Sequence, residues 1–124
     1  MGFLNALFGN ASSLDPEKLQ KEYGELLCDG ETIEQAFVII RDKWVFTNKR
    51  LIIQDTQGLT GKKREYMSIP YRSIERFSIE TAGTFDDDCE MKVWVRGCAE
   101  PIDQEFAPET DIKGVERMLA KYVL

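Results

Sequence analysis

The sequence contains no histidine. Histidine is the commonest general base in enzymes and the commonest protein ligand of transition metals, so its absence removes the usual starting point for both kinds of site. The sequence also lacks a serine nucleophile elbow, a Walker phosphate loop and a dinucleotide-binding glycine pattern. We therefore expect no enzyme activity, no catalytic residues and no cofactor.

Long hydrophobic runs are missing as well. No stretch approaches the roughly 18–20 apolar residues that a membrane-spanning helix needs. The N-terminal stretch carries Phe3, Leu4, Leu7 and Phe8, but it is too short for a signal peptide and has no basic flank. It begins like a myristoylation signal, although Ala6 stands where serine or threonine is expected. These features predict a cytoplasmic protein.

Cysteine is scarce, and the side chains that bind metals are poorly spaced. Cys28, Cys89 and Cys98 make an odd number without a C-x-x-C pair, which predicts free thiols in a reducing compartment and gives little support for zinc. The run of acids at residues 86–88 could attract calcium, but it lacks the spacing of an EF-hand loop. A solvated acidic loop without a metal is the prediction.

Charge is distributed unevenly along the chain. The net charge of −6 divides into −5 over residues 1–40, +5 over residues 41–76 and −6 over residues 77–124. The overall negative charge repels phosphate at long range, so we expect no nucleic-acid partner. The positive middle segment still allows a local anion site, and the opposed segments allow head-to-tail self-association.

The 124 residues suffice for one core. We expect an N-terminal arm at residues 1–13 and a single domain at residues 14–124. An N-terminal helix should begin at Asp15, with Pro16 in its first turn, and end at residues 29–30. A C-terminal helix should follow Asp111, and its buried stripe comprises Ile112, Val115, Leu119 and Tyr122.

Short strand signals fill the segment between the two helices. Asn48-Lys49 is a tight-hairpin signal, Asp42-Lys43 indicates another turn, and the offset from Ile74 to Phe77 predicts a bulge. The cleanest alternation of side chains runs through residues 91–96, where Met91 and Trp94 should face opposite sides. The expected fold class is therefore mainly β (α+β), with about seven short antiparallel strands between two helices.

The sequence resembles the bacterial pleckstrin-homology (PH-like) domain family. The similarity runs through residues 42–53, 55–63, 66–74 and 77–83, and it includes the hairpin Thr47-Asn48-Lys49-Arg50-Leu51 followed by Ser68-Ile69-Pro70-Tyr71. The resemblance implies a PH-like barrel of seven strands in two sheets, capped by the C-terminal helix and preceded by the N-terminal helix. It also implies ring-like homo-oligomers without catalytic activity. A fold by itself does not fix a function.

Two sets of residues are candidates for binding. The first is basic and comprises Lys43, Lys62, Lys63 and Arg64; if the turn at residues 42–43 and the loop at residues 58–63 lie at one end, they could hold a phosphate or an anionic lipid headgroup. Arg50 is expected to be structural, pinning the hairpin or pairing with an acid. In eukaryotic relatives of the fold, basic residues at the open end of the barrel hold lipid phosphates.

The second set comprises candidates for an oligomer interface: Trp94, Phe3, Leu4, Leu7, Phe8 and Tyr23. Trp94 should point away from the core, as interface aromatics often do, unless an N-terminal helix or its cationic neighbours cover it. The stripe of the first helix, which includes Tyr23, could pack on its own sheet or on a neighbour. We expect a homo-oligomer, with an unidentified protein partner or peripheral membrane contact as alternatives.

Overall fold

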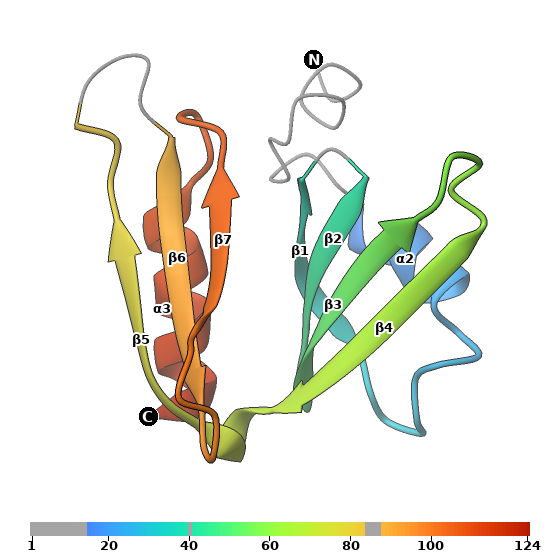
Figure 1. Ribbon diagram of the computed structural model, residues 1–124. Coiled ribbons are helices and arrows are strands. Elements are labelled where there is room, and N and C mark those ends of the chain that lie inside the picture. The colour runs from blue at the N-terminus through green and yellow to red at the C-terminus, as the bar shows by residue number, and fades with distance from the viewer. Residues whose placement is uncertain (1–14, 40, 84–87) are drawn as a thin grey trace. The chain divides into compact units, whose positions relative to one another are not determined.

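Seven described strands form two sheets in a computed structural model of the chain, which describes residues 15–39, 41–83 and 88–124 (Figure 1). One sheet has four strands in the order β1-β2-β3-β4, and the other has three in the order β5-β6-β7. The strands are β1 (Ile33–Ile39), β2 (Asp42–Thr47), β3 (Arg50–Gln57), β4 (Lys63–Pro70), β5 (Ile74–Glu80), β6 (Cys89–Val95) and β7 (Ile102–Phe106).

The predicted mainly β fold, with seven described antiparallel strands in two sheets between two helices, is confirmed. In the part of the chain that is described, however, strand pairing forms two separate sheets and no closed ring of hydrogen bonds, so the sheets are not a true barrel. The chain also divides into two compact units, the first ending at Ser68 and the second beginning at Ile69. A single domain at residues 14–124 stays a prediction.

Helix α2 (Pro16–Glu22) starts where the sequence predicts it to start. The side chain of Asp15 accepts a hydrogen bond from the amide of Glu17 at 3.0 Å, as an N-cap does. The helix ends at Glu22, so the predicted end at residues 29–30 is wrong. Gly24 follows the C-cap residue Tyr23, and a glycine costs a helix interior about 1 kcal/mol relative to alanine.

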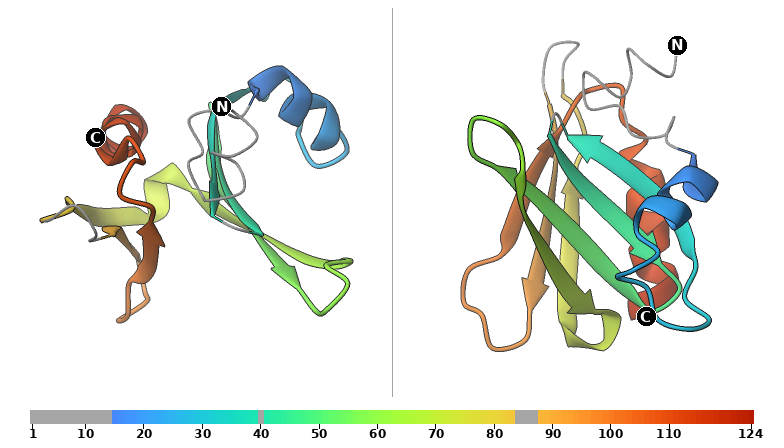
Figure 2. Two further views of the ribbon diagram at one scale, coloured as in Figure 1. Left: turned by 90° about the horizontal axis from the view of Figure 1, so that it is seen from above. Right: turned by 90° about the vertical axis from the view of Figure 1, so that its right-hand side faces the viewer.

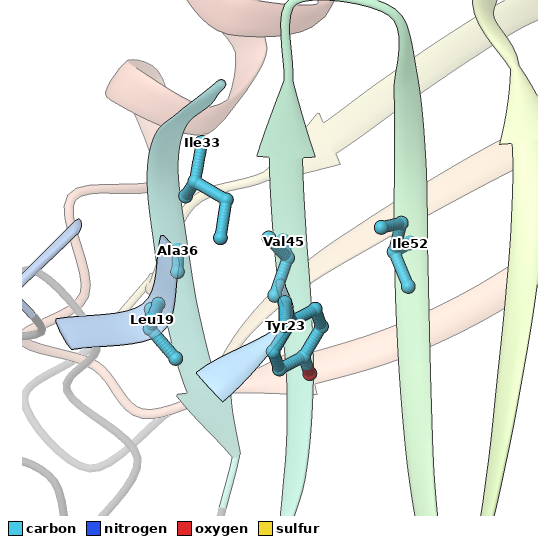
Figure 3. Packing of buried hydrophobic residues seen from close by; sticks show 6 residues of the cluster. All are labelled: Leu19, Tyr23, Ile33, Ala36, Val45 and Ile52. Atoms are coloured by element: carbon cyan, nitrogen blue, oxygen red, sulfur yellow. The ribbon is translucent and has the colours of Figure 1, made fainter. Parts of the chain in front are cut away.

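The apolar face of α2 packs on one face of the four-stranded sheet (Figure 2). Figure 3 shows the buried cluster, which comprises Leu19, Tyr23, Ile33, Ala36, Val45 and Ile52. The hydroxyl of Tyr23 donates a hydrogen bond to Oε1 of Gln54, and burial raises the pKa of Tyr23 above its usual value. The stripe of this helix therefore packs on its own sheet, except that Leu26 is 42% exposed.

The predicted strand features are mostly confirmed. Asn48-Lys49 connects β2 to β3, and the pairing of β5 with β6 shifts register between Ile74 and Arg76, where a bulge was expected. Met91 and Val93 are buried, whereas Trp94 on the other side of β6 is partly exposed. The predicted turn at residues 42–43 is wrong, because both residues belong to β2 and pair with β1.

Helix α3 (Ile112–Val123) lies along the three-stranded sheet (Figure 1) and contacts β5, β6 and the 3-10 turn η2 (Tyr71–Ser73). The side chain of Asp111 accepts a hydrogen bond from the amide of Gly114 and caps the helix. Ile112, Val115 and Leu119 are buried, as the sequence predicts. The last member of the stripe, Tyr122, stacks on the ring of Tyr71 with centroids 4.7 Å apart.

Candidate functional site

The basic residues gather at one end of the four-stranded sheet. Arg41 precedes β2, and its Nη2 donates a hydrogen bond to the carbonyl of Gly58 at 2.6 Å. The hydroxyl of Thr56 donates to the carbonyl of Arg41 at 2.7 Å. These bonds hold Arg41 against the turn between β3 and β4 (Figure 1).

The four predicted anion-binding residues differ in what they contact. Lys43 forms an ion pair with Glu22 at 3.1 Å, so part of its charge is already compensated. Arg64 shares a hydrogen bond with the side chain of Tyr66, which raises the pKa of the guanidinium. Lys62 and Lys63 are exposed. The structure therefore places Lys62 between β3 and β4 and Lys63 and Arg64 at the start of β4, and it directs Lys43 to α2. We call residues 58–64 the β3–β4 turn.

The apolar residue Leu59 projects from the same turn. Its side chain is fully exposed, and it lies between Gly58 and Gly61, whose positive φ angles of 78° and 69° suit only glycine without strain. The turn therefore presents one fully exposed apolar side chain beside consecutive cations.

Arg50 lies at the opposite end of the sheet and is structural, as expected. Its Nε donates to Oε2 of Glu31 at 2.9 Å, and its Nη2 donates to Oε1 of Glu31 at 3.0 Å. The same guanidinium also binds the carbonyl of Leu26 and the hydroxyl of Ser68. Arg50 therefore joins the loop before β1 to β3 and β4, and it is not available to an external anion.

Glu31 completes this structural cluster. Its side chain is fully enclosed, and it also accepts hydrogen bonds from Thr47 Oγ1 and the amide of Cys28. Burial alone raises the pKa of a carboxyl group, but the hydrogen bonds from Arg50, Thr47 and Cys28 outweigh burial and lower the pKa of Glu31 to about 2. The carboxylate is therefore held in its charged form.

This depressed pKa predicts a specific loss of stability in acid. The pKa in the folded chain is about 2 and the ordinary value is 4.5, so the stabilisation is complete above pH 4.5 and is lost as the pH falls towards 2. A difference of this size corresponds to roughly 3 kcal/mol. Urea unfolding followed by tryptophan fluorescence should show this decline in the wild type and a smaller one in Glu31→Gln. An identical pH dependence in both proteins contradicts the assignment.

The three-stranded sheet carries Trp94 on its polar face. The guanidinium of Arg76 on the neighbouring strand lies 4.5 Å from the centroid of the Trp94 ring, which is a cation–π arrangement. Directly paired residues on neighbouring strands share a face, so this face also carries Ser78 and Lys92. The predicted cationic neighbour of Trp94 is therefore present, and the ring stays partly exposed.

Three carboxylates lie at the other end of this polar face. Glu80 pairs with Glu90 across β5 and β6, and Glu90 pairs with Glu105 across β6 and β7. We call these three residues the carboxylate row. They line a hollow of about 380 Å³ together with Thr81, Gly83, Asp88 and Cys89.

The remaining interface candidates have different outcomes. Phe3, Leu4, Leu7 and Phe8 lie outside the described residues. Tyr23 is 1% exposed and packs within its own sheet, so Trp94 is the interface candidate that presents a surface among the described residues.

A comparison with known families decides the identity. The model of the family described as bacterial PH domain matches residues 2–123. The chain belongs to the bacterial PH domain family. This bacterial PH domain is 49% identical over 121 residues to the uncharacterized protein YjqA of Bacillus subtilis (strain 168), with 97% of each chain covered.

Two solved structures show the same fold. A DUF1696 family protein with a pleckstrin-homology domain from Shewanella loihica PV-4 matches this PH domain with a TM-score of 0.86 and 45% identity, over 94% of this chain and 99% of the other. A pleckstrin homology domain from Shewanella amazonensis SB2B matches with a TM-score of 0.81 and 49% identity, over 98% of both chains.

Several residues of this PH domain escaped the sequence analysis. A hydrogen bond to Gly58 brings Arg41 to the turn between β3 and β4. Strand register brings the three members of the carboxylate row together. No local motif reveals either arrangement. Leu59 could have been found from its position between two glycines in a turn. Within the described ranges, no group of three or more acidic or cysteine side chains is arranged to hold a metal ion. The helices of those ranges include none long and apolar enough to cross a membrane.

Proposed function

We propose that this bacterial PH domain is a non-catalytic interaction module that self-associates into a ring-like homo-oligomer. The supporting observation is Trp94, a large aromatic residue that stays partly exposed on a face otherwise made of polar and charged side chains. Aromatic residues flanked by arginine are enriched at the centres of protein interfaces. The absence of histidine from the sequence supports a role without catalysis.

The compartment and the excluded partners belong to the same proposal. Three free cysteines, of which Cys28 and Cys98 are exposed, suit a reducing compartment, and we place the module in the cytoplasm. The net charge of −6 disfavours nucleic acid as a partner.

Light scattering over a range of micromolar protein concentrations tests the self-association. We expect an oligomer that Trp94→Ala weakens at least about tenfold, since truncating a central interface aromatic commonly costs 2 kcal/mol or more. Met67→Ala is the matched control, because Met67 is a partly exposed apolar residue on the other sheet. A strict monomer that is unaffected by salt contradicts the proposal.

A second candidate function is the binding of phosphate groups on anionic lipids. The observation that favours it is the bond between Arg41 and Gly58, which holds one more cation against the turn that carries Lys62 and Lys63. Basic clusters attract anionic membranes by about 1 kcal/mol per residue near the surface. Leu59 on the same turn offers an apolar side chain to the headgroup region.

Co-sedimentation with vesicles tests this candidate. Vesicles containing phosphatidylserine should pellet the protein, neutral phosphatidylcholine vesicles should not, and the triple variant K62Q/K63Q/R64Q should pellet less. The triple variant K18Q/K21Q/K113Q removes the same number of charges elsewhere and is the control. If the wild type stays in the supernatant with anionic vesicles, lipid binding is excluded as a function of this turn.

A further inference from the structure

The carboxylate row places like charges directly side by side. Neighbouring strands lie about 4.8 Å apart, and like charges directly opposite each other destabilise a sheet. Lys92 lies 3.5 Å from Glu90, which compensates one member of the row. Glu80 and Glu105 form no ion pair with any described residue. The row is therefore an arrangement that a cationic partner would stabilise.

Within the compact unit that begins at Ile69, no described helix or strand covers the face that carries the row. Its members Arg76, Ser78, Glu80 and Glu105 are exposed, and Trp94 is partly exposed. The opposite face of the same strands carries the buried residues Met91, Val93 and Phe106. This sheet face thus offers negative charge at one end and an aromatic ring at the other.

The β3–β4 turn has the complementary chemistry. Lys62, Lys63 and Arg64 are consecutive and exposed, and neither Lys62 nor Lys63 forms an ion pair in the described part of the chain. Leu59 is fully exposed at the tip of the turn. The turn therefore presents positive charges, which complement the carboxylate row, and one apolar side chain, which complements the ring of Trp94.

We propose that the β3–β4 turn of one copy docks on the carboxylate row of a second copy. This inference rests on the self-association proposed above and names the two surfaces that meet. A second copy is favoured over an unrelated basic protein because both surfaces belong to this chain and each contains three neighbouring charges. The two surfaces differ, so the contact is heterologous and produces a ring when the rotation between copies closes.

The contact should depend strongly on salt. Copies with a net charge of −6 repel each other at a distance, so attraction between the two patches acts only at short range. Raising the ionic strength from about 0.1 M to 1 M shortens the screening length from about 10 Å to 3 Å. We expect the oligomer to dissociate over this range.

Charge reversal of each surface tests the inference. Variant K62E/K63E reverses the turn, and variant E80K/E105K reverses the row. Because juxtaposed like charges cost several kcal/mol, each variant alone should raise the dissociation constant at least about a hundredfold. Combining all four substitutions in one chain should restore the assembly at the wild-type net charge. Variant K18E/K113E matches the charge change of the turn variant and should assemble normally.

Mixing the two double variants gives a sharper result. The native turn of the row variant can dock on the native row of the turn variant, and the reversed turn can dock on the reversed row, so the mixture should form assemblies in which the two variants alternate. Light scattering measures the mass, and the fluorescence of the buried Trp44 verifies that each variant is folded.

The outcomes separate the two proposals. A monomeric wild type at every concentration removes the proposed self-association and this contact with it. A wild-type oligomer that neither reversal weakens removes this contact alone, because assembly then uses another surface. Disruption by the single reversals without pairing in the mixture also overturns the contact.

Discussion

Replacing Arg50 with methionine should lower the free energy of unfolding by about 3–5 kcal/mol, the usual cost of removing one partner of a buried ion pair. The substitution leaves the fully enclosed carboxylate of Glu31 without its counter-ion. It also removes the donors to Leu26 and Ser68, so the loop before β1 loses its attachment to β4.

Urea unfolding at neutral pH, followed by tryptophan fluorescence, measures this effect. Lys49→Met makes the same kind of change at the exposed neighbouring position and should alter stability by less than about 0.5 kcal/mol. The double variant E31L/R50M should recover much of the loss, because an apolar pair can replace a buried ion pair. Equal stability of the Arg50 and Lys49 variants would falsify the structural role of the pair.

Replacing Leu119 with alanine should lower the free energy of unfolding by about 2–5 kcal/mol. Leu119 is 0% exposed and lies in the buried stripe of α3 with Ile112 and Val115. Truncation removes apolar contacts and leaves a cavity that close-packed neighbours fill only in part.

The chain provides a matched control for this change. Leu124 follows the last residue of the same helix and is 92% exposed, so Leu124→Ala should change stability by less than about 0.5 kcal/mol. Thermal unfolding of both variants, monitored by circular dichroism, compares identical chemistry in buried and exposed positions. Similar melting temperatures for the two variants contradict the assignment of Leu119 to the core.

The sequence predicts features that local chemistry determines. The caps at Asp15 and Asp111 follow from side-chain oxygens that accept bonds from helix amides within three residues. The hairpin at Asn48-Lys49 and the alternation from Met91 to Trp94 follow from the two-residue period of a strand. Each of these patterns can be read within a window of a few residues.

Contacts between distant segments were not predictable in the same way. Glu31 meets Arg50 from 19 residues away, and nothing near Glu31 in the sequence marks it as buried. The ion pair between Lys43 and Glu22 was likewise not predictable from the sequence. It directs Lys43 to α2 and thereby separates it from the other residues of the predicted basic set. The sequence predicted that Arg50 pins the hairpin or pairs with an acid, but strand register was needed to show which acid.

The charges on β4 have a consequence for how copies can associate. β4 has a paired neighbour on one side only within the four-stranded sheet, and its first six residues are exposed. Unpaired strand edges are templates for amyloid-like growth, and charged side chains such as those of Lys63, Arg64 and Glu65 oppose it. Neutralising these three side chains should therefore favour fibrils over defined oligomers, which links the solubility of the chain to the turn that we propose as its contact.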